Sequence, residues 1–117
     1  MFDFEKLEVY QVTKTQNIEV LKYLLVRKDI DEDIKAQWKK ASLGTILNLA
    51  ESTARMLHEE KKHYLTNARS NINECVALLE VTRALKVIEE ETAANFYSRY
   101  EQMSKMMLGM IRSFSDK

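Results

Sequence analysis

Residues 93–114 read AANFYSRYEQMSKMMLGMIRSF, and apolar or aromatic side chains recur through this stretch at alternating intervals of three and four residues. The members of this series are Ala93, Phe96, Tyr100, Met103, Met107, Met110 and Phe114. Because one helical turn takes about 3.6 residues, this spacing places all of these side chains along one side of a helix. The residues between them are mostly charged or small. The stretch therefore predicts a long helix with one side facing a protein core.

A similar series precedes it and predicts another helix with one buried side. Its members are Leu65, Ala68, Ile72, Cys75 and Leu79, again spaced by three or four residues. Since Cys75 lies within this apolar series, we expect a buried, unreactive thiol and not a nucleophile. As the only cysteine, it excludes a disulfide within the chain and is typical of a reducing compartment.

A helix over residues 4–26 has the weakest apolar pattern. Its predicted core face consists of Leu7, Ile18, Leu21 and Leu25. Gln11 and Lys14 interrupt that face, and several β-branched residues lower the intrinsic helix propensity. We therefore expect this helix to be the least stable element on its own and to depend on packing.

The remaining predicted helix is the second along the chain. It begins near Ile30, where Asp29 and Glu32 have the spacing of a capping box. Short connections are predicted at about residues 27–30, 58–60 and 84–90, and short connections make neighbouring helices antiparallel. The chain has 117 residues, no proline and only two glycines, which disfavours a fold with many tight turns. The sequence thus predicts one domain, residues 1–117, with an all-α fold: an up-down-up-down antiparallel four-helix bundle.

The helix that starts near Ile30 carries apolar residues on more than one side. One stripe consists of Ile34, Trp38, Ala41, Thr45, Asn48 and Ser52. A second stripe, rotated around the helix, consists of Leu43, Leu47, Ala50, Ala54 and Leu57. A helix in a monomeric bundle buries only one side, so the second stripe predicts an interface between copies of the chain. The alternative is that the bundle packs this helix more centrally.

The chain has 18 lysine and arginine residues and 18 aspartate and glutamate residues, so its net charge gives no support for a general polyanion binder. A local basic surface remains compatible with this balance. The candidate contacts to nucleic acid are Lys35, Lys39, Arg55, Lys61 and Lys62. Acidic residues are interleaved with them, so an ordinary solvated surface is the alternative explanation.

No catalytic residues, metal ligands or cofactors are predicted. The Glu-x-x-His spacing of di-metal carboxylate bundles occurs once, at Glu60 and His63, whereas such a site needs it on two helices. The longest uncharged stretch, 41–50, is far shorter than the roughly 20 residues that span a bilayer. We therefore expect a non-enzymatic, cytoplasmic protein without membrane contact.

Four segments, taken in order, resemble a known family. The start, 4–11, resembles the opening of the bacterial four-helix-bundle proteins known as 23S rRNA intervening-sequence proteins. Segment 41–52 is similar to the core motif of that family and contains its polar residues Asn48 and Glu51. Segments 64–74 and 106–113 match the family pattern as well. Gly44, Ile46, Ser52 and Ser70 depart from the residues usual at these positions.

The resemblance implies a ring-shaped homo-oligomer, expected to be a pentamer, with a poorly defined biochemical role. Some family members are encoded within insertions in large-subunit rRNA genes, and related bundles are accessory subunits of reverse transcriptases. The resemblance therefore implies structured RNA or a nucleic-acid enzyme as a partner. A purely structural protein–protein interaction module without nucleic-acid contact is the alternative.

Overall fold

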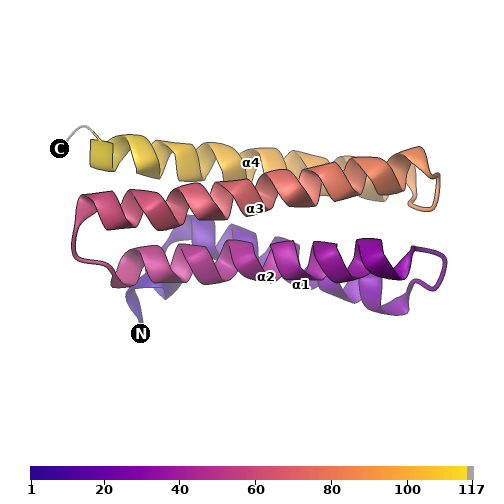
Figure 1. Cartoon of the computed structure of the whole chain (residues 1–117), viewed down its shortest axis with the longest axis horizontal. Helices are drawn as coiled ribbons and strands as arrows, with labels where there is room; N and C mark the ends of the chain where they lie inside the picture. Colours follow the sequence, from indigo (N-terminus) through magenta and orange to yellow (C-terminus); the bar gives the residue numbers. More distant parts are fainter. Residues whose placement is uncertain (116–117) are drawn as a thin grey trace.

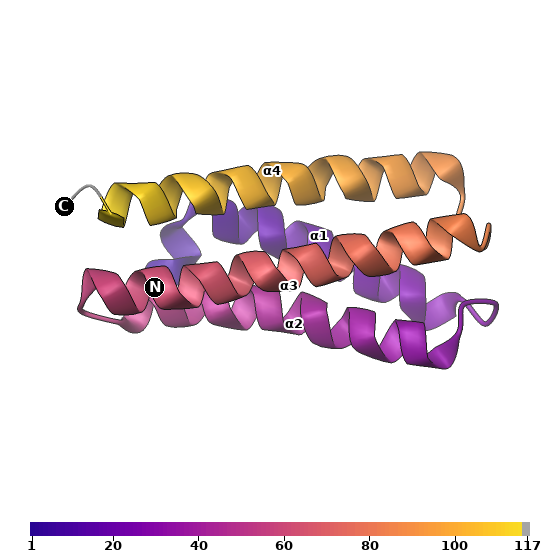
Figure 2. The same ribbon diagram turned by 45° about the horizontal axis from the view of Figure 1, so that its top comes forward.

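The computed structural model describes residues 1–115, which form a short 3-10 helix followed by four α-helices. These elements are η1 (Asp3–Lys6), α1 (Glu8–Val26), α2 (Glu32–Ala54), α3 (His58–Ala84) and α4 (Glu90–Ser115). Each α-helix packs against the preceding one, and α1 also packs against α4, so the four run antiparallel in a bundle of 46 × 25 × 21 Å (Figure 1, Figure 2). Within residues 1–115 there is no strand. The predicted fold class is confirmed.

The apolar series of α3 and α4 form the centre of the core. All five members of the α3 series are buried, and so are the first five of the α4 series, from Ala93 to Met107. Met110 and Phe114 are half-buried near the end of α4. In the middle of the bundle Trp38 donates a hydrogen bond of 3.0 Å from Nε1 to the Tyr100 hydroxyl, which satisfies both buried polar groups.

The first helix differs from the prediction in its bounds and in its buried side. Leu7 has an extended backbone and separates η1 from α1. The buried face consists of Val9, Thr13, Gln16, Asn17, Val20 and Leu24. Ile18 and Leu25, which were predicted to face the core, are exposed. Neighbouring helices offer partners to the side-chain amides of two buried polar residues: Gln16 donates to the Phe96 carbonyl at 3.0 Å, and Asn17 donates to the Ser42 carbonyl at 2.6 Å.

The predicted start of the second helix is also wrong by two residues. Asp31, and not Asp29, is the N-cap of α2, and its carboxylate accepts from the backbone N–H groups of Asp33 and Ile34. The connection to α3 comprises residues 55–57, so α3 begins at His58, where a loop had been predicted. The connection between α3 and α4, residues 85–89, agrees with the prediction.

Arg27 joins the two loops at one end of the bundle. Its guanidinium donates to Asp29 at 2.8 and 2.7 Å and to Glu89 at 3.1 Å, and it also donates to the Tyr23 hydroxyl and the Val87 carbonyl. The hydrogen bond from Arg27 lowers the pKa of the Asp29 carboxyl, and hydrogen bonds from Tyr23 and Arg27 lower the pKa of Glu89. Burial and the bond to Glu89 raise the pKa of Tyr23 to about 12. This cluster links the α1–α2 loop to the α3–α4 loop.

Candidate functional site

The outer side of α2 carries the predicted interface residues. Leu43 and Leu47 project into solvent with exposed fractions of 49% and 66%. Ala54 is exposed and Ala50 is half-buried on the same side, while Leu57 is exposed in the loop that follows α2. The opposite side of α2 holds Trp38, Ala41, Thr45, Leu49 and Ser52 in the core. The two sides predicted for this helix are thus one core face and one apolar outer face.

The N-terminal segment lies along the second half of this outer face. A shallow groove is formed by Phe2 and Phe4 on one wall and by Leu47, Ala50 and Ala54 on the other. The Phe2 ring stacks at 6.0 Å on Phe4 but is itself 74% exposed. The apolar outer face of α2 is therefore partly covered near Ala50 and Ala54, and it remains open around Leu43 and Leu47.

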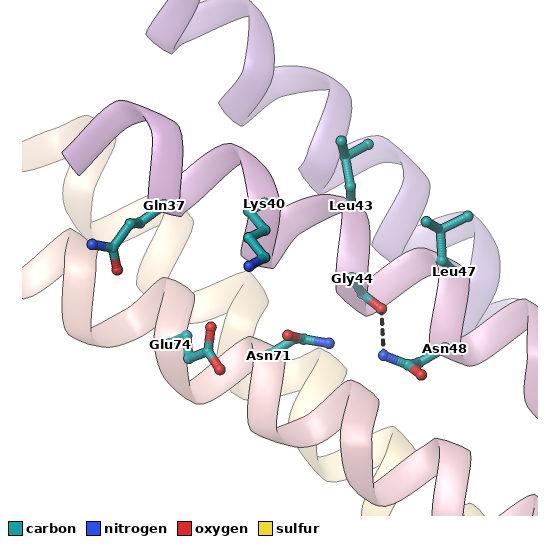
Figure 3. Close-up of a pocket in the computed structure, with 8 residues that line it drawn as sticks. All are labelled: Gln37, Lys40, Leu43, Gly44, Leu47, Asn48, Asn71 and Glu74. Carbon is teal, nitrogen blue, oxygen red and sulfur yellow. Dashed lines mark hydrogen bonds between the residues drawn. The ribbon is translucent and has the colours of Figure 1, made fainter. Parts of the chain in front are cut away.

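A second groove follows the line where α2 meets α3 and has Leu43 and Leu47 on its rim (Figure 3). Its volume is about 740 Å³. The lining residues are Gln37, Lys40, Leu43, Gly44, Leu47 and Asn48 of α2 and Asn71 and Glu74 of α3. Figure 3 shows Lys40 on the α2 side and Glu74 on the α3 side of this groove. The groove thus combines an apolar rim with amide groups and two opposite charges.

Gly44 marks the position where α2 and α3 approach closely. A Cβ atom at this position would lie 2.7–2.9 Å from the amide atoms of Asn71, which is too close for unshifted packing. The close neighbour of Gly44 is therefore the side chain of Asn71. Asn48 donates from Nδ2 to the Gly44 carbonyl at 3.0 Å, so its hydrogen bond lies within α2.

Glu51 and Arg55, four residues apart near the end of α2, form an ion pair with an N–O distance of 2.5 Å. Arg55 also donates to the Tyr64 hydroxyl at 2.9 Å, and its guanidinium lies 4.7 Å from the centre of the Tyr64 ring. The hydrogen bond with Glu51 raises the pKa of Arg55. These contacts fix Arg55 at the junction of α2 and α3.

The predicted nucleic-acid contacts do not form one surface. Lys35 is buried: its ammonium group donates to the Arg27 carbonyl at 2.7 Å and pairs with Glu32 at 2.9 Å, so its assignment as a contact was wrong. Its aliphatic stem is buried, while its ammonium group is held by a backbone carbonyl of the α1–α2 loop. Lys39, in contrast, is half-buried on α2 and has no ion pair within residues 1–115.

The other three candidates lie at the opposite end of α2. Residues 39 and 55 are separated by roughly 24 Å along a helix. Lys61 approaches the Ser52 carbonyl and the Phe114 ring, and Lys62 pairs with Glu59 at 2.7 Å. The side chains of Arg55, Lys61 and Lys62 therefore all contact other groups of the same chain. Among the five predicted nucleic-acid contacts, only Lys39 has no such contact within residues 1–115.

Reactive side chains are not gathered anywhere in the described part of the chain. His58 and His63 are exposed, and residues 1–115 contain no group of three or more potential metal ligands. Cys75 is buried, as predicted, and this burial raises the pKa of its thiol to about 11. No helix within these residues is long and apolar enough to cross a bilayer.

Five groove residues were not among the predicted site residues: Gln37, Lys40, Gly44, Asn71 and Glu74. Lys40 belongs to a visible cluster of lysines in the sequence, but nothing in the sequence places Asn71 and Glu74 beside it. Phe2 was missed as well. Which residues of α2 and α3 become neighbours depends on how the two helices are aligned along their length. The spacing of residues within one helix does not predict that alignment.

Comparison with known protein families gives one match for this chain. The family described as 23S rRNA-intervening sequence protein matches residues 5–109, which is most of the chain. A search of curated proteins finds no match. The matched range includes α1, α2 and α3 completely and most of α4. The chain therefore belongs to the 23S rRNA-intervening sequence protein family.

Proposed function

We propose that this chain is a non-catalytic building block that associates with copies of itself, through the outer face of α2, into a ring-shaped scaffold or adaptor. The observation that carries the proposal is the exposure of Leu43 and Leu47 on a helix whose other side already fills the core. The family resemblance supports five copies as the expected number. The family is not a known enzyme family.

Burial of these leucines supplies a driving force for association. Their exposed area is contiguous with the alanines of the same stripe and with Phe2, so it forms one apolar surface. Removing a half-exposed leucine from water contributes roughly 1–2 kcal/mol. Contiguous apolar surface of this kind is typical of protein–protein contact sites.

The test substitutes one leucine in the proposed interface and one outside it. Leu47→Gln places a polar amide in the interface, whereas Leu25→Gln makes the same change at a 70% exposed leucine on α1. We expect Leu47→Gln to weaken self-association roughly tenfold, measured by sedimentation equilibrium. Leu25→Gln is expected to leave it unchanged. Equal effects of the two substitutions would exclude α2 as the interface.

Contact between the ring and structured RNA is the second candidate function. The family description names 23S rRNA, and α2 has no acidic residue between Asp33 and Glu51. Lys14 and Lys22 on the neighbouring α1 are exposed and, like Lys39, have no ion pair within residues 1–115. We take these three lysines, and not Arg55, Lys61 and Lys62, as the residues to test for contact with RNA. A nucleic-acid-handling protein is the other partner that the resemblance supports.

The RNA candidate is tested by salt dependence. We expect the triple change Lys14→Gln, Lys22→Gln and Lys39→Gln to lower affinity for a structured RNA and to reduce the slope of log affinity against log salt by roughly 2–3. The matched control neutralises Lys86, Lys105 and Arg112, three exposed cations on the α3–α4 half. Salt-insensitive binding, or none, favours the alternative of a purely structural protein–protein module.

A further inference from the structure

The outer sides of α2 and α3 carry two stripes with the same spacing and opposite charge. The α2 stripe consists of Ala36, Lys40, Leu43 and Leu47, and all four are exposed. The α3 stripe consists of Ser70, Glu74, Ala77 and Val81, and these are exposed as well. Both follow intervals of four, three and four residues, which keeps each set on one side of its helix. Each stripe contains a single charged residue.

Lys40 and Glu74 lie level with each other along the bundle. Asn71 contacts Gly44, and Lys40 is one turn before Gly44 while Glu74 is almost one turn after Asn71. Because α2 and α3 are antiparallel, these steps lead to the same height, and both residues line the groove in Figure 3. Neither residue forms an ion pair within residues 1–115, although both are exposed and line this groove.

We infer that the outer side of α2 in one copy packs antiparallel against the outer side of α3 in the next copy, with Lys40 paired to Glu74 of that next copy. This inference rests on the proposed self-association and names the surface that receives α2. Copies in a closed ring are related by rotation alone. When the bundles stand parallel to the ring axis, residues that are level within one copy remain level across the interface.

The side-chain sizes of the two stripes are complementary in this register. Leu43 and Leu47, the large members of the α2 stripe, meet the part of α3 around the small Ser70. Ala36 meets Ala77, where two small residues let the helix backbones approach. Large side chains of one helix seated over small positions of its neighbour are the basis of close helix packing. The single charges meet between these two contacts.

The position of the two stripes also suits a small ring. Outer faces of neighbouring helices in a four-helix bundle point roughly 90° apart. A ring needs an angle of about 90° between its two contact faces for four copies and about 108° for five. Contact between α2 and α2 of another copy would instead be two-fold symmetric and would end at a dimer.

Charge reversal tests the pairing. The single variants Lys40→Glu and Glu74→Lys place like charges in the interface, and each is expected to weaken self-association roughly tenfold. The double variant restores opposite charges and is expected to associate like the unmodified chain. An equimolar mixture of the two single variants is expected to associate more strongly than either variant alone, because every contact between unlike variants pairs opposite charges, although a ring of five keeps at least one contact between like variants. Light scattering on size-exclusion peaks measures the mass in every case.

Matched controls carry the same charge changes elsewhere. Lys22→Glu and Glu101→Lys reverse exposed charges on α1 and α4 and are expected to keep the mass of the unmodified chain. Recovery in the mixture excludes an effect within one chain, since no single copy there has both changes. If the single variants associate normally, or the double variant and the mixture stay dissociated, the α2–α3 pairing is wrong. A monomeric unmodified chain would remove the proposed function together with it.

Discussion

At the scale of single residues, Arg27 organises one end of the bundle. It contacts a tyrosine hydroxyl of α1, a carboxylate of the α1–α2 loop, and a carboxylate and a backbone carbonyl of the α3–α4 loop. We expect Arg27→Gln to lower the melting temperature at pH 7 by roughly 5 °C, because the shorter neutral amide reaches fewer of these partners. Arg112→Gln, at an exposed arginine on α4, is the control and is expected to have little effect.

The effect of Arg27 depends on pH in a direction set by its partners. The folded-state pKa values of Asp29 and Glu89 are lowered, so their contribution to stability is present above the unfolded pKa of about 4 and is lost as pH falls through the folded values. The difference in melting temperature between the unmodified chain and Arg27→Gln is therefore expected to narrow below about pH 4. A difference that stays constant from pH 7 to pH 3 would contradict this assignment.

Two residue-level predictions from the sequence failed because a neighbour in space changed the outcome. Asp29 and Asp31 are both suitable caps, and Asp29 is held by Arg27, which leaves the capping position to Asp31. Lys35 looks like a surface lysine in the sequence, but the Arg27 carbonyl in the loop accepts a hydrogen bond from its ammonium group. In contrast, the Glu51–Arg55 pair was predictable because both partners lie on one helix, four residues apart.

At the scale of elements, α1 differs from the other helices by the polarity of its buried side. Thr13, Gln16 and Asn17 lie in the core, and the oxygen atoms Thr13 Oγ1, Gln16 Oε1 and Asn17 Oδ1 have no hydrogen-bond partner. Buried polar atoms without partners cost free energy, whereas the α3 series is wholly apolar. The attachment of α1 to the bundle is therefore weaker per residue than that of α3.

This difference predicts the order of local opening. We expect backbone amides in the middle of α1 to exchange with deuterium at least roughly tenfold faster than those in the middle of α3, since α1 opens without exposing a large apolar face. Hydrogen exchange followed by mass spectrometry or NMR measures this directly. Equal protection of the two helices would show that the polar contacts of Gln16 and Asn17 hold α1 as firmly as the core holds α3.

The quality of each helix prediction follows the contrast of its pattern. The α4 series could be assigned from the sequence because apolar and charged residues alternate with helical periodicity and few exceptions. The buried side of α1 could not be assigned from the sequence, because Ile18, Leu21 and Leu25 form a more apolar stripe. In the structure Gln16 and Asn17 are buried instead, since carbonyl groups of α4 and α2 accept hydrogen bonds from their side chains. The candidate site was predictable as far as the α2 leucines, whereas Asn71 and Glu74 depend on the register between two helices.

At the scale of the whole molecule, the bundle buries its core completely and still presents leucines on α2. The core face and the outer face of α2 were both visible in the sequence as two stripes, and the structure leaves the leucines of the second stripe exposed. The unmatched charges Lys40 and Glu74 lie beside that stripe. The proposed contact between copies through α2 would account for the exposed leucines and for the charges of Lys40 and Glu74 together.

The most direct measurement of this account is the mass of the unmodified chain in solution, determined by light scattering on a size-exclusion peak at micromolar concentration. The account predicts a defined assembly several times the chain mass of 13.7 kDa, with five copies as the expected number. A single species of 13.7 kDa at every concentration tested would contradict it, because the exposed face of α2 would then have no partner of its own kind.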